Sequence, residues 1–404
     1  MSLRVLDLFA GCGGLSAGFK EAGFEICAAN EVDKWAADTF THNNPSIEMI
    51  QEDIRNIPES FWESRFSKKI DIVIGGPPCQ GFSVSGRRQY GEIRPTNSLV
   101  SDYLKVVKIV QPDFVVMENV RGFKTGSISK DKKVLDYVTT TLELLGYNVY
   151  HKLLNAEDYG VPSLRSRIFI IASKFKFKKS PFPAPSHFRE KNLSSSNAYT
   201  HVSCLDAISD LPELQACEGS EDMQKYAHPP LNPYQRRMRQ GSNGVFNHVA
   251  MKHTARVVER FKLIQQGESS YRHSKQIEGA EKIKYKMNNQ RLVQTKPSLC
   301  ITANFQSNFI HPLQHRNLTA REAARLMSFP DSYVFQGKRT QMSSKFLKKY
   351  GREHEDFLSQ YNQIGNSVPP LLSESVANSL LETILAGEGN YQQSFEKQQS
   401  SLEF

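Results

Sequence analysis

The sequence predicts an α/β fold of the nucleotide-binding kind, because its opening residues pass from a strand through a glycine turn into a helix. Residues 5–9 (VLDLF) form a short apolar run, which is typical of a buried strand. Residues 10–14 (AGCGG) supply the turn, and apolar residues then recur at helical spacing from Leu15 to Gly23. In such folds the turn backbone approaches a ligand closely. The spacing Gly-x-Gly-Gly is not the dinucleotide fingerprint.

Two acidic residues after the next apolar runs indicate the ligand that this turn accepts. Glu31 follows a predicted strand at 26–29, where a carboxylate can accept hydrogen bonds from a ribose diol. Asp53 follows a predicted strand at 48–51, within reach of an adenine amino group. No phosphate-binding lysine accompanies them, which favours an adenosyl ligand without phosphates, S-adenosylmethionine above all. Each carboxylate taken singly is equally typical of a helix N-cap or a surface charge.

Cys79 is the strongest candidate for a nucleophile. It follows a predicted buried strand at 71–74 and the sequence Gly-Gly-Pro-Pro at 75–78, which ends the strand and stiffens the chain. The cysteine is therefore presented at the carboxyl end of a strand, where open α/β sheets bind their ligands. A thiol in such a setting can act as a thiolate nucleophile. For a lone cysteine, a buried structural role is the commoner alternative.

A second cluster of candidate residues contains Glu118, Arg165 and Arg167. Glu118 follows a predicted buried strand at 114–117, and a carboxyl there could act as a general acid with its pKa raised by burial. Arg165 and Arg167 precede the apolar run 168–172, and strand alternation places both on one face. They could hold a base carbonyl, a phosphate or Glu118 itself. A cap or salt bridge for Glu118, and surface pairing for the arginines, remain alternatives.

Length and charge suggest about two domains and a polyanionic partner, since the chain has 404 residues and a formal charge of +9. Between residues 234 and 291 basic and aromatic side chains alternate, although a solvated helix face would give the same pattern. These residues are Arg236, Arg237, Arg239, Lys252, Arg256, Arg260, Lys262, Arg272, Lys275, Lys282, Lys284, Lys286 and Arg291, with Tyr234, Phe246, Phe261, Tyr271 and Tyr285.

Composition also bears on the compartment. There is no apolar run long enough to span a membrane and no leader-like start, so we expect a cytoplasmic protein without a membrane partner. Six cysteines are scattered without a Cys-x-x-Cys pair, which argues against a metal site or a disulfide scaffold. The end of the chain, 390–404, is rich in Gln and Ser and is expected to be a disordered tail.

Taken together, these motifs resemble the DNA (cytosine-5)-methyltransferase family, specifically its bacterial restriction–modification branch. The resemblance spans nearly the whole chain, and the order of the motifs is far more specific than any one of them. The matching segments are 7–14, Asn30 with Glu31, Asp53, 75–83, 118–120, 165–167, 316–325 and 363–370.

This resemblance implies a doubly wound, S-adenosylmethionine-dependent methyltransferase sheet with a smaller target recognition domain. The expected boundaries are 1–184 for the first part of the catalytic domain and 185–335 for target recognition, with 336–389 returning to the catalytic domain. The expected partner is double-stranded DNA bound between the domains. The protein is expected to be a monomer, and a restriction endonuclease is a possible functional partner.

The resemblance also implies roles for individual residues. Cys79 would add to carbon 6 of a flipped-out cytosine, Glu118 would act at ring nitrogen 3, and Arg167 would hold the base carbonyl. Arg165 would support the nucleophile loop, and residues 81–97 would close over the base. The product of the cofactor would be S-adenosylhomocysteine, and no metal is expected. The implied cofactor residues are Phe9, Gly11, Gly13, Leu15, Glu31, Val32, Asp53, Ile54, Pro78, Leu99, Asn366 and Val368.

The sequence departs from the family pattern at one position, and two alternative functions have to be compared with this interpretation. Ser163 occupies the place of a usual glutamine, so any DNA or loop contact of that glutamine is in doubt. A tRNA cytosine methyltransferase shares the chemistry but typically carries a Cys-Phe-Thr tripeptide, which this sequence lacks. A catalytically dead DNA-binding protein would be expected to have lost Cys79 or Glu118, and both are present.

Overall fold

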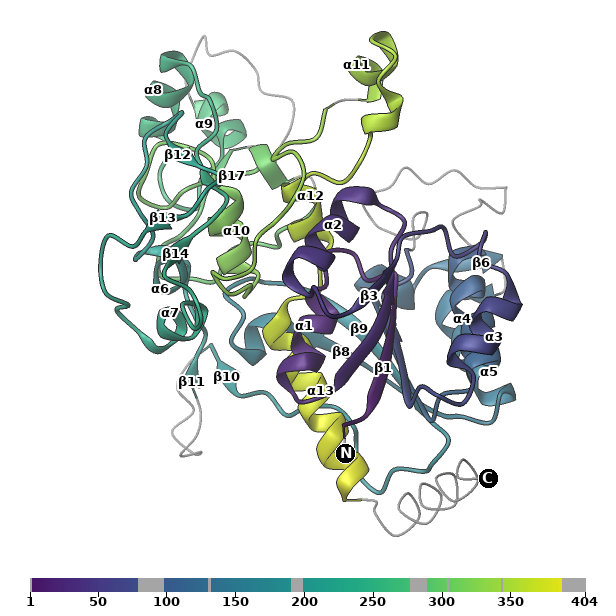
Figure 1. Ribbon diagram of the computed structural model, residues 1–404. Coiled ribbons are helices and arrows are strands. Elements are labelled where there is room, and N and C mark those ends of the chain that lie inside the picture. The colour runs from purple at the N-terminus through teal and green to yellow at the C-terminus, as the bar shows by residue number, and fades with distance from the viewer. Residues whose placement is uncertain are drawn as a thin grey trace.

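The computed structural model describes residues 2–78, 98–129, 132–189, 199–276, 289–303, 305–342 and 344–386, and Figure 1 shows their arrangement. Its centre is a seven-stranded sheet in the order β3-β2-β1-β4-β5-β9-β8. The predicted α/β fold is confirmed. The strands are β1 (Arg4–Leu8), β2 (Glu25–Asn30), β3 (Glu48–Ile50), β4 (Ile72–Gly75), β5 (Phe114–Val120), β8 (Asn148–Asn155) and β9 (Ser166–Ser173).

The order in which strands are added to the sheet reverses at β1, which pairs with β2 on one side and with β4 on the other, both in parallel. In open α/β sheets, ligands bind at the carboxyl ends of the strands beside such a reversal. β9 runs antiparallel to both of its neighbours, so its amino end lies at the same edge as the carboxyl ends of the parallel strands. Residues at the carboxyl ends of the parallel strands and at the amino end of β9 therefore lie along the same side of the sheet.

Two strand boundaries differ from the sequence prediction. β5 continues past the apolar run to Val120, so Glu118 lies within the strand rather than after it. β9 begins at Ser166, so Arg165 precedes the strand and Arg167 lies within it. The reason is cross-strand pairing, since Glu118 lies opposite Phe169 and Val120 opposite Arg167. Backbone pairing extends β5 through polar residues that carry no apolar signal.

Helices cover both faces of the sheet (Figure 1). α1 and α13 lie on one face, and α3, α4 and α5 lie on the other. Successive strand residues alternate between the two cores, as Val5 and Leu6 do. The helices are α1 (Gly14–Glu21), α2 (Lys34–Asn43), α3 (Glu59–Phe66), α4 (Ser98–Val110), α5 (Val134–Leu144) and α13 (Pro370–Leu385). No helix among the described residues combines the length and apolar character needed to cross a membrane.

The end of the described chain returns to its beginning. α13 packs along α1, and the Ser373 hydroxyl donates to the Leu15 carbonyl at 2.6 Å. A Cβ added to Gly18 would lie 2.4 Å from the backbone nitrogen of Glu374, so only glycine allows this approach. The sheet and the glycine turn are thus stabilised by residues more than 350 positions away.

In the sequence, short elements follow β9 and precede α13, and they share an apolar core and several buried ion pairs. Arg325 on α10 pairs with Asp210 at 3.0 Å and with Asp331 at 2.6 Å, all three fully buried. Arg316 pairs with Glu322 at 2.6 Å, and this pair lowers the pKa of Glu322 despite its burial. The elements include α6 (Cys204–Ile208), α7 (Pro233–Met238), α8 (Ala255–Leu263), α9 (Ser270–Gln276), α10 (Ala320–Leu326), α11 (Ser344–Lys349) and α12 (Gln360–Asn366), with two-residue strands such as β10 (His187–Phe188), β12 (Gly219–Ser220), β15 (His248–Val249) and β17 (Phe309–Ile310).

Several residues of the basic stretch predicted to face DNA serve this interior instead. Arg239 pairs with buried Asp210, and its guanidinium stacks 3.7 Å from the Tyr226 ring centroid. Arg291 is 4% exposed and donates to four backbone carbonyls. Arg237, by contrast, is exposed and pairs with Glu374 of α13 at the surface. Alternation of charged and aromatic residues in the sequence therefore does not predict which of these side chains are exposed and which are buried.

Candidate active site

Glu118 and Arg167 form the centre of the candidate site. They come from adjacent strands, β5 and β9, and Arg167 Nε lies 2.7 Å from Glu118 Oε1. Both side chains are about 10% exposed. Burial raises the pKa of Glu118, and the positive charges of Arg167 and Arg165 oppose that rise. The carboxyl is therefore held where it can carry a proton more readily than an exposed glutamate.

Glu118 lies directly against the turn that leads to Cys79. A Cβ added to Gly76 would stand 3.2 Å from Glu118 Oε2, so the small residue makes room for the carboxylate. A Cβ on Gly75 would lie 2.3 Å from the Leu8 carbonyl oxygen, which excludes any side chain there. Cys79 and the segment 81–97 lie outside the described residues. The described turn ends at Pro78, next to the cysteine.

Asn119 is a residue of this site that received no role from the sequence. Its side-chain nitrogen donates to the Pro77 carbonyl at 2.9 Å, and both groups are buried. The bond joins the end of β5 to the turn before Cys79. Its position immediately after Glu118, at the carboxyl edge of the sheet, was the available signal.

Arg165 joins the start of β9 to two distant segments of the chain. Its guanidinium donates to the carbonyls of Ile301 at 2.6 Å, Gly365 at 3.1 Å and Ser367 at 2.7 Å. The side chain is 1% exposed. Within the described residues, Arg165 thus ties the start of β9 to 301 and 365–367, rather than to the nucleophile turn. Its positive charge still acts on Glu118.

Replacing Arg165 with lysine is expected to lower the free energy of unfolding by about 3 kcal/mol. An ammonium group cannot reach carbonyls spread over three backbone positions, and each buried carbonyl left unpaired costs about 1–3 kcal/mol. Urea denaturation followed by circular dichroism measures the difference. The matched control is Arg236→Lys, at an exposed position of α7, which should remain within about 0.5 kcal/mol of wild type. Equal stability of both variants would contradict this role for Arg165.

Ser163, at the position of the glutamine expected from the family pattern, contacts a segment that is distant in the sequence. The residue is fully buried, and its hydroxyl lies 3.4 Å from the Leu299 carbonyl oxygen. Ser163 also forms an isolated parallel bridge with Ser298. The hydroxyl is thus engaged with the segment that Arg165 holds at Ile301.

The first glycine of the opening turn is tied to Glu31. The Gly11 amide donates to Glu31 Oε2 and the Asp33 amide donates to Oε1, both at 2.8 Å. Burial raises the pKa of Glu31, and these two bonds oppose it. Gly11 has a φ of +57° and open space where a Cβ would be. It is the position in this turn where a ligand can approach the backbone.

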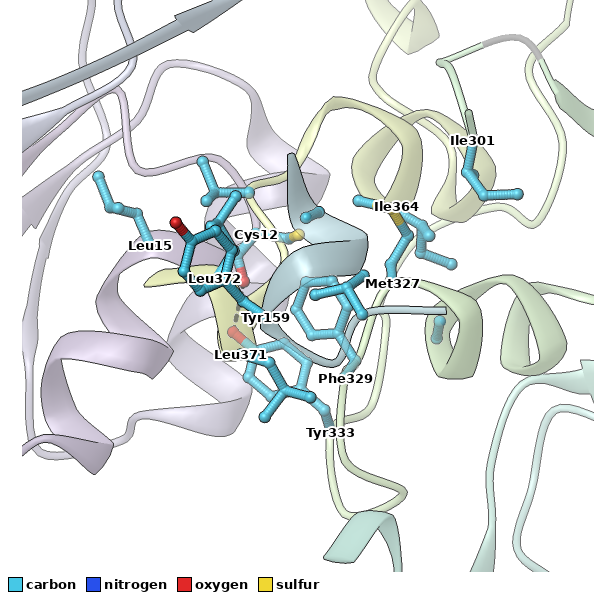
Figure 2. Packing of buried hydrophobic residues seen from close by; sticks show 14 of the residues in the cluster. Cys12, Leu15, Tyr159, Ile301, Met327, Phe329, Tyr333, Ile364, Leu371 and Leu372 are labelled. Atoms are coloured by element: carbon cyan, nitrogen blue, oxygen red, sulfur yellow. Dashed lines mark hydrogen bonds between the residues drawn. The ribbon is translucent and has the colours of Figure 1, made fainter. Parts of the chain in front are cut away.

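At the other two glycines of the turn, the space that a side chain would need is filled by the protein itself. A Cβ on Gly13 would lie 2.6 Å from the Tyr333 hydroxyl, and one on Gly14 would lie 2.0 Å from the Ser367 hydroxyl. Figure 2 shows Phe329, Tyr333 and Leu371 gathered beside Cys12 of the turn. Leu15 is likewise a core residue, 5% exposed in the same cluster. Gly13 and Leu15 thus lie where the turn packs against the protein core.

Five of the remaining predicted cofactor residues follow the ends of the adjacent strands β1 to β4, whereas Leu99 lies on α4 and Asn366 and Val368 lie at the end of α12. Val32 is 58% exposed next to Glu31, which leaves an apolar surface at the edge of the sheet. Phe9, half-buried, follows β1 with a φ of +58°, a strained conformation for this residue. Asp53 pairs with Arg55, which lowers the pKa of Asp53. Of the others, Ile54 and Val368 are buried, Pro78 and Leu99 half-buried and Asn366 exposed.

Asp7 is a buried acidic group at this edge that the sequence did not single out. It is fully buried on β1 and accepts a hydrogen bond from the Ser16 hydroxyl at 2.6 Å. Burial raises its pKa to about 7. A single aspartate inside the apolar run 5–9 was the signal that marked it. Across the described residues, no cluster of three or more His, Cys, Asp or Glu side chains could hold a metal ion.

Comparison with known proteins places these features in a family. The profile of "C-5 cytosine-specific DNA methylase" matches residues 3–382. Type II methyltransferase M.DdeI of Desulfomicrobium norvegicum is 44% identical over 388 residues, covering 94% of this chain and 88% of that protein. Type II methyltransferase M1.HphI of Haemophilus parahaemolyticus is 35% identical, covering 95% and 87% of the two chains.

Solved structures agree with the fold. An Escherichia coli protein described as a prophage-encoded DNA modification methyltransferase superposes with a TM-score of 0.72 at 25% identity, over 95% of this chain and 99% of that chain. A DNMT2 variant of Spodoptera frugiperda shares the fold at a TM-score of 0.55 and 18% identity, over 94% and 100% of the chains. With a family match over nearly its whole length and relatives of 44% and 35% identity, the chain belongs to the C-5 cytosine-specific DNA methylases.

Proposed function

We propose that this enzyme transfers a methyl group from S-adenosylmethionine to carbon 5 of a cytosine within a specific duplex DNA sequence, through a covalent bond to Cys79. The observation that supports this most is the buried Glu118–Arg167 pair lying against the turn before Cys79. A proton-carrying group, a fixed cation and a thiol at one sheet edge are the groups that this reaction needs.

The chemistry follows from the poor nucleophilicity of carbon 5. The Cys79 thiolate forms a bond to carbon 6, and the electron pair of the 5,6 double bond becomes available at carbon 5. Glu118 gives a proton or hydrogen bond to nitrogen 3, which offsets the charge created by addition. Arg167 holds the base carbonyl while keeping Glu118 in place. After methylation, a base removes the carbon 5 proton, the double bond re-forms and the thiolate leaves.

The residues at the sheet edge fit S-adenosylmethionine. This cofactor supplies an electrophilic methyl sulfonium and leaves as S-adenosylhomocysteine. Gly11 offers open backbone, the Glu31 carboxylate is fixed by two amides, and Val32 presents an exposed apolar surface. Phe9, Asp53, Ile54, Pro78, Leu99, Asn366 and Val368 would complete the site. Gly13 and Leu15 would support it from the protein interior.

Different parts of the chain would perform catalysis and DNA sequence recognition. Residues 1–184 and 336–389 would perform the chemistry, and 185–335 would read the DNA sequence. The buried pairs of Arg325 with Asp210 and Asp331 join separate parts of 185–335 and support its folding as one unit. A stacked cytosine is out of reach of any such site, so the base would be flipped out at a cost of a few kcal/mol. The segment 81–97 would close over it.

The biological setting we propose is protection of DNA in a bacterial cytoplasm. Both relatives described above are named type II methyltransferases, which supports a pairing with a restriction endonuclease. The enzyme would act as a monomer on double-stranded DNA.

Transfer of radiolabelled methyl groups distinguishes the possible substrates. We expect incorporation into duplex DNA carrying the target sequence and none into tRNA, with bisulfite sequencing showing protection at one cytosine per site. Incorporation into tRNA alone would support the tRNA methyltransferase. Binding of duplex DNA with no incorporation into either substrate would support the inactive DNA-binding protein.

A further inference from the structure

Residues 338–356, called here the α11 arm, form a projection between α10 and α12 that the site described above does not use. The arm contains α11 and the single turn η5 (Glu353–Glu355). Figure 1 shows α11 standing beyond the sheet, on the side away from the N-terminal end of β1. This is the side of the carboxyl ends of the parallel strands, where Glu31 and Glu118 lie.

Both ends of the arm are fixed at this edge. At the base, the Gln360 amide donates to the Lys338 carbonyl at 3.0 Å, which closes the loop on itself. The Leu358 amide donates to Asp33 Oδ2 at 2.8 Å, just after Glu31. The rings of Trp35 and Phe357 lie 5.5 Å apart. The arm is therefore rooted on α2, next to the proposed cofactor residues.

Positive charge is concentrated on α11. The carboxylates of the arm, Glu353, Glu355 and Asp356, all lie in or after η5, and Glu355 pairs there with Lys338 and, at 2.6 Å, with Arg352. Lys345, Lys348 and Lys349 are exposed on α11. In the portion of the chain that the structure describes, no carboxylate lies within ion-pair distance of these three ammonium groups.

Exposed aromatic rings accompany these lysines. Phe346 is 44% exposed and Tyr350 is 56% exposed, with their ring centroids 4.6 Å apart. The Lys349 ammonium lies 5.4 Å from the centre of the Tyr350 ring. Only Leu347 of this helix is buried among its described side chains, so packing does not explain the composition of α11. Clustered ammonium groups with flat rings suit a polyanion that has both phosphates and apolar sugar surface.

We propose that the α11 arm binds the phosphate backbone of the duplex beyond the base pairs held at the catalytic site. This inference rests on the proposed function, because it takes the substrate to be duplex DNA lying along the carboxyl edge of the sheet. The arm adds a sequence-independent contact separate from the 185–335 insertion. It would strengthen DNA binding without changing which cytosine is methylated.

The test replaces Lys345, Lys348 and Lys349 together with glutamine, which keeps length and polarity while removing charge. The matched control replaces Lys176, Lys178 and Lys179 with glutamine. These lysines are exposed beyond the C-terminal end of antiparallel β9, so they lie at the amino ends of the parallel strands, opposite to the arm. Dissociation constants are measured against salt concentration for a long duplex and for a short one that ends just outside the target site.

For the arm variant on the long duplex, we expect the slope of log K against log salt to fall by about 0.9 for each phosphate that the arm no longer neutralises. The dissociation constant for the short duplex, kcat at saturating DNA and the methylated position should stay as in wild type. The control variant should match wild type in all of these measurements and in the slope on the long duplex. A wild-type slope in the arm variant would overturn the inference, and equal weakening on both duplexes would overturn the position assigned to the arm. Failure of the proposed function is a separate result, since wild type would then methylate no duplex.

Discussion

Replacing Cys79 with alanine is expected to reduce methyl transfer to duplex DNA to background while leaving binding of DNA and S-adenosylmethionine intact. Among the groups of the proposed site, the thiolate alone can add to carbon 6, and without that addition carbon 5 has too little electron density to accept a methyl group. The turn that presents residue 79 is fixed by Asn119 and by the close contact of Gly75 with β1, and neither depends on the thiol. The loss should therefore appear in kcat.

Radiolabel incorporation measures activity, and calorimetry measures both affinities. Cys27→Ala is a matched control, because this half-buried cysteine on β2 touches none of the proposed catalytic groups. It should retain wild-type activity. Measurable turnover by Cys79→Ala would contradict the assignment of the nucleophile.

Replacing Glu118 with glutamine is expected to lower kcat by about 10²-fold or more, with little change in DNA affinity. Glutamine keeps the size of the side chain and can donate a hydrogen bond to nitrogen 3, but it cannot deliver a proton. It also removes the negative charge opposite Arg167, whose Nε lies 2.7 Å from the carboxylate.

The pH profile separates this chemical role from a structural one. Burial raises the pKa of Glu118, so the protonated form persists to higher pH than in an exposed glutamate. If that form is the active one, wild-type kcat falls as pH rises through the raised pKa, and Glu118→Gln lacks this fall. Asp113→Asn is the control, since Asp113 precedes the other end of β5, has a pKa raised by burial and pairs with Lys174 at 3.5 Å. Unchanged kcat in Glu118→Gln would make Glu118 a structural residue.

The sequence was most informative where chemistry and local structure coincide. The glycine turn after 5–9, the residues at the ends of β2 and β3 and the Gly-Gly-Pro-Pro turn could all be located, because each is defined by neighbours in the chain. Burial of Glu118 and the rise of its pKa followed from its apolar strand. These features depend on a few consecutive residues, so their physical signal is local.

Features that depend on distant partners could not be predicted in the same way. The partners of Arg165 are carbonyls at 301, 365 and 367, and nothing near Arg165 in sequence identifies them. Tyr333, 320 residues after Gly13, fills the space that a side chain at Gly13 would need, and no residue near Gly13 in sequence indicates this. Arg239 has the context of a phosphate-binding residue, but its partner is Asp210. In each case tertiary packing decides between interior and surface.

The covalent step is the central claim, and DNA containing 5-fluorocytosine at the target position tests it most directly. Fluorine replaces the proton that must leave carbon 5, so elimination is blocked and the enzyme should remain bonded to the DNA. We expect a denaturation-resistant complex that forms only with S-adenosylmethionine present, with mass spectrometry locating the bond on the peptide containing Cys79. Absence of the complex with an enzyme that actively methylates normal DNA, or a bond to another residue, would contradict the account.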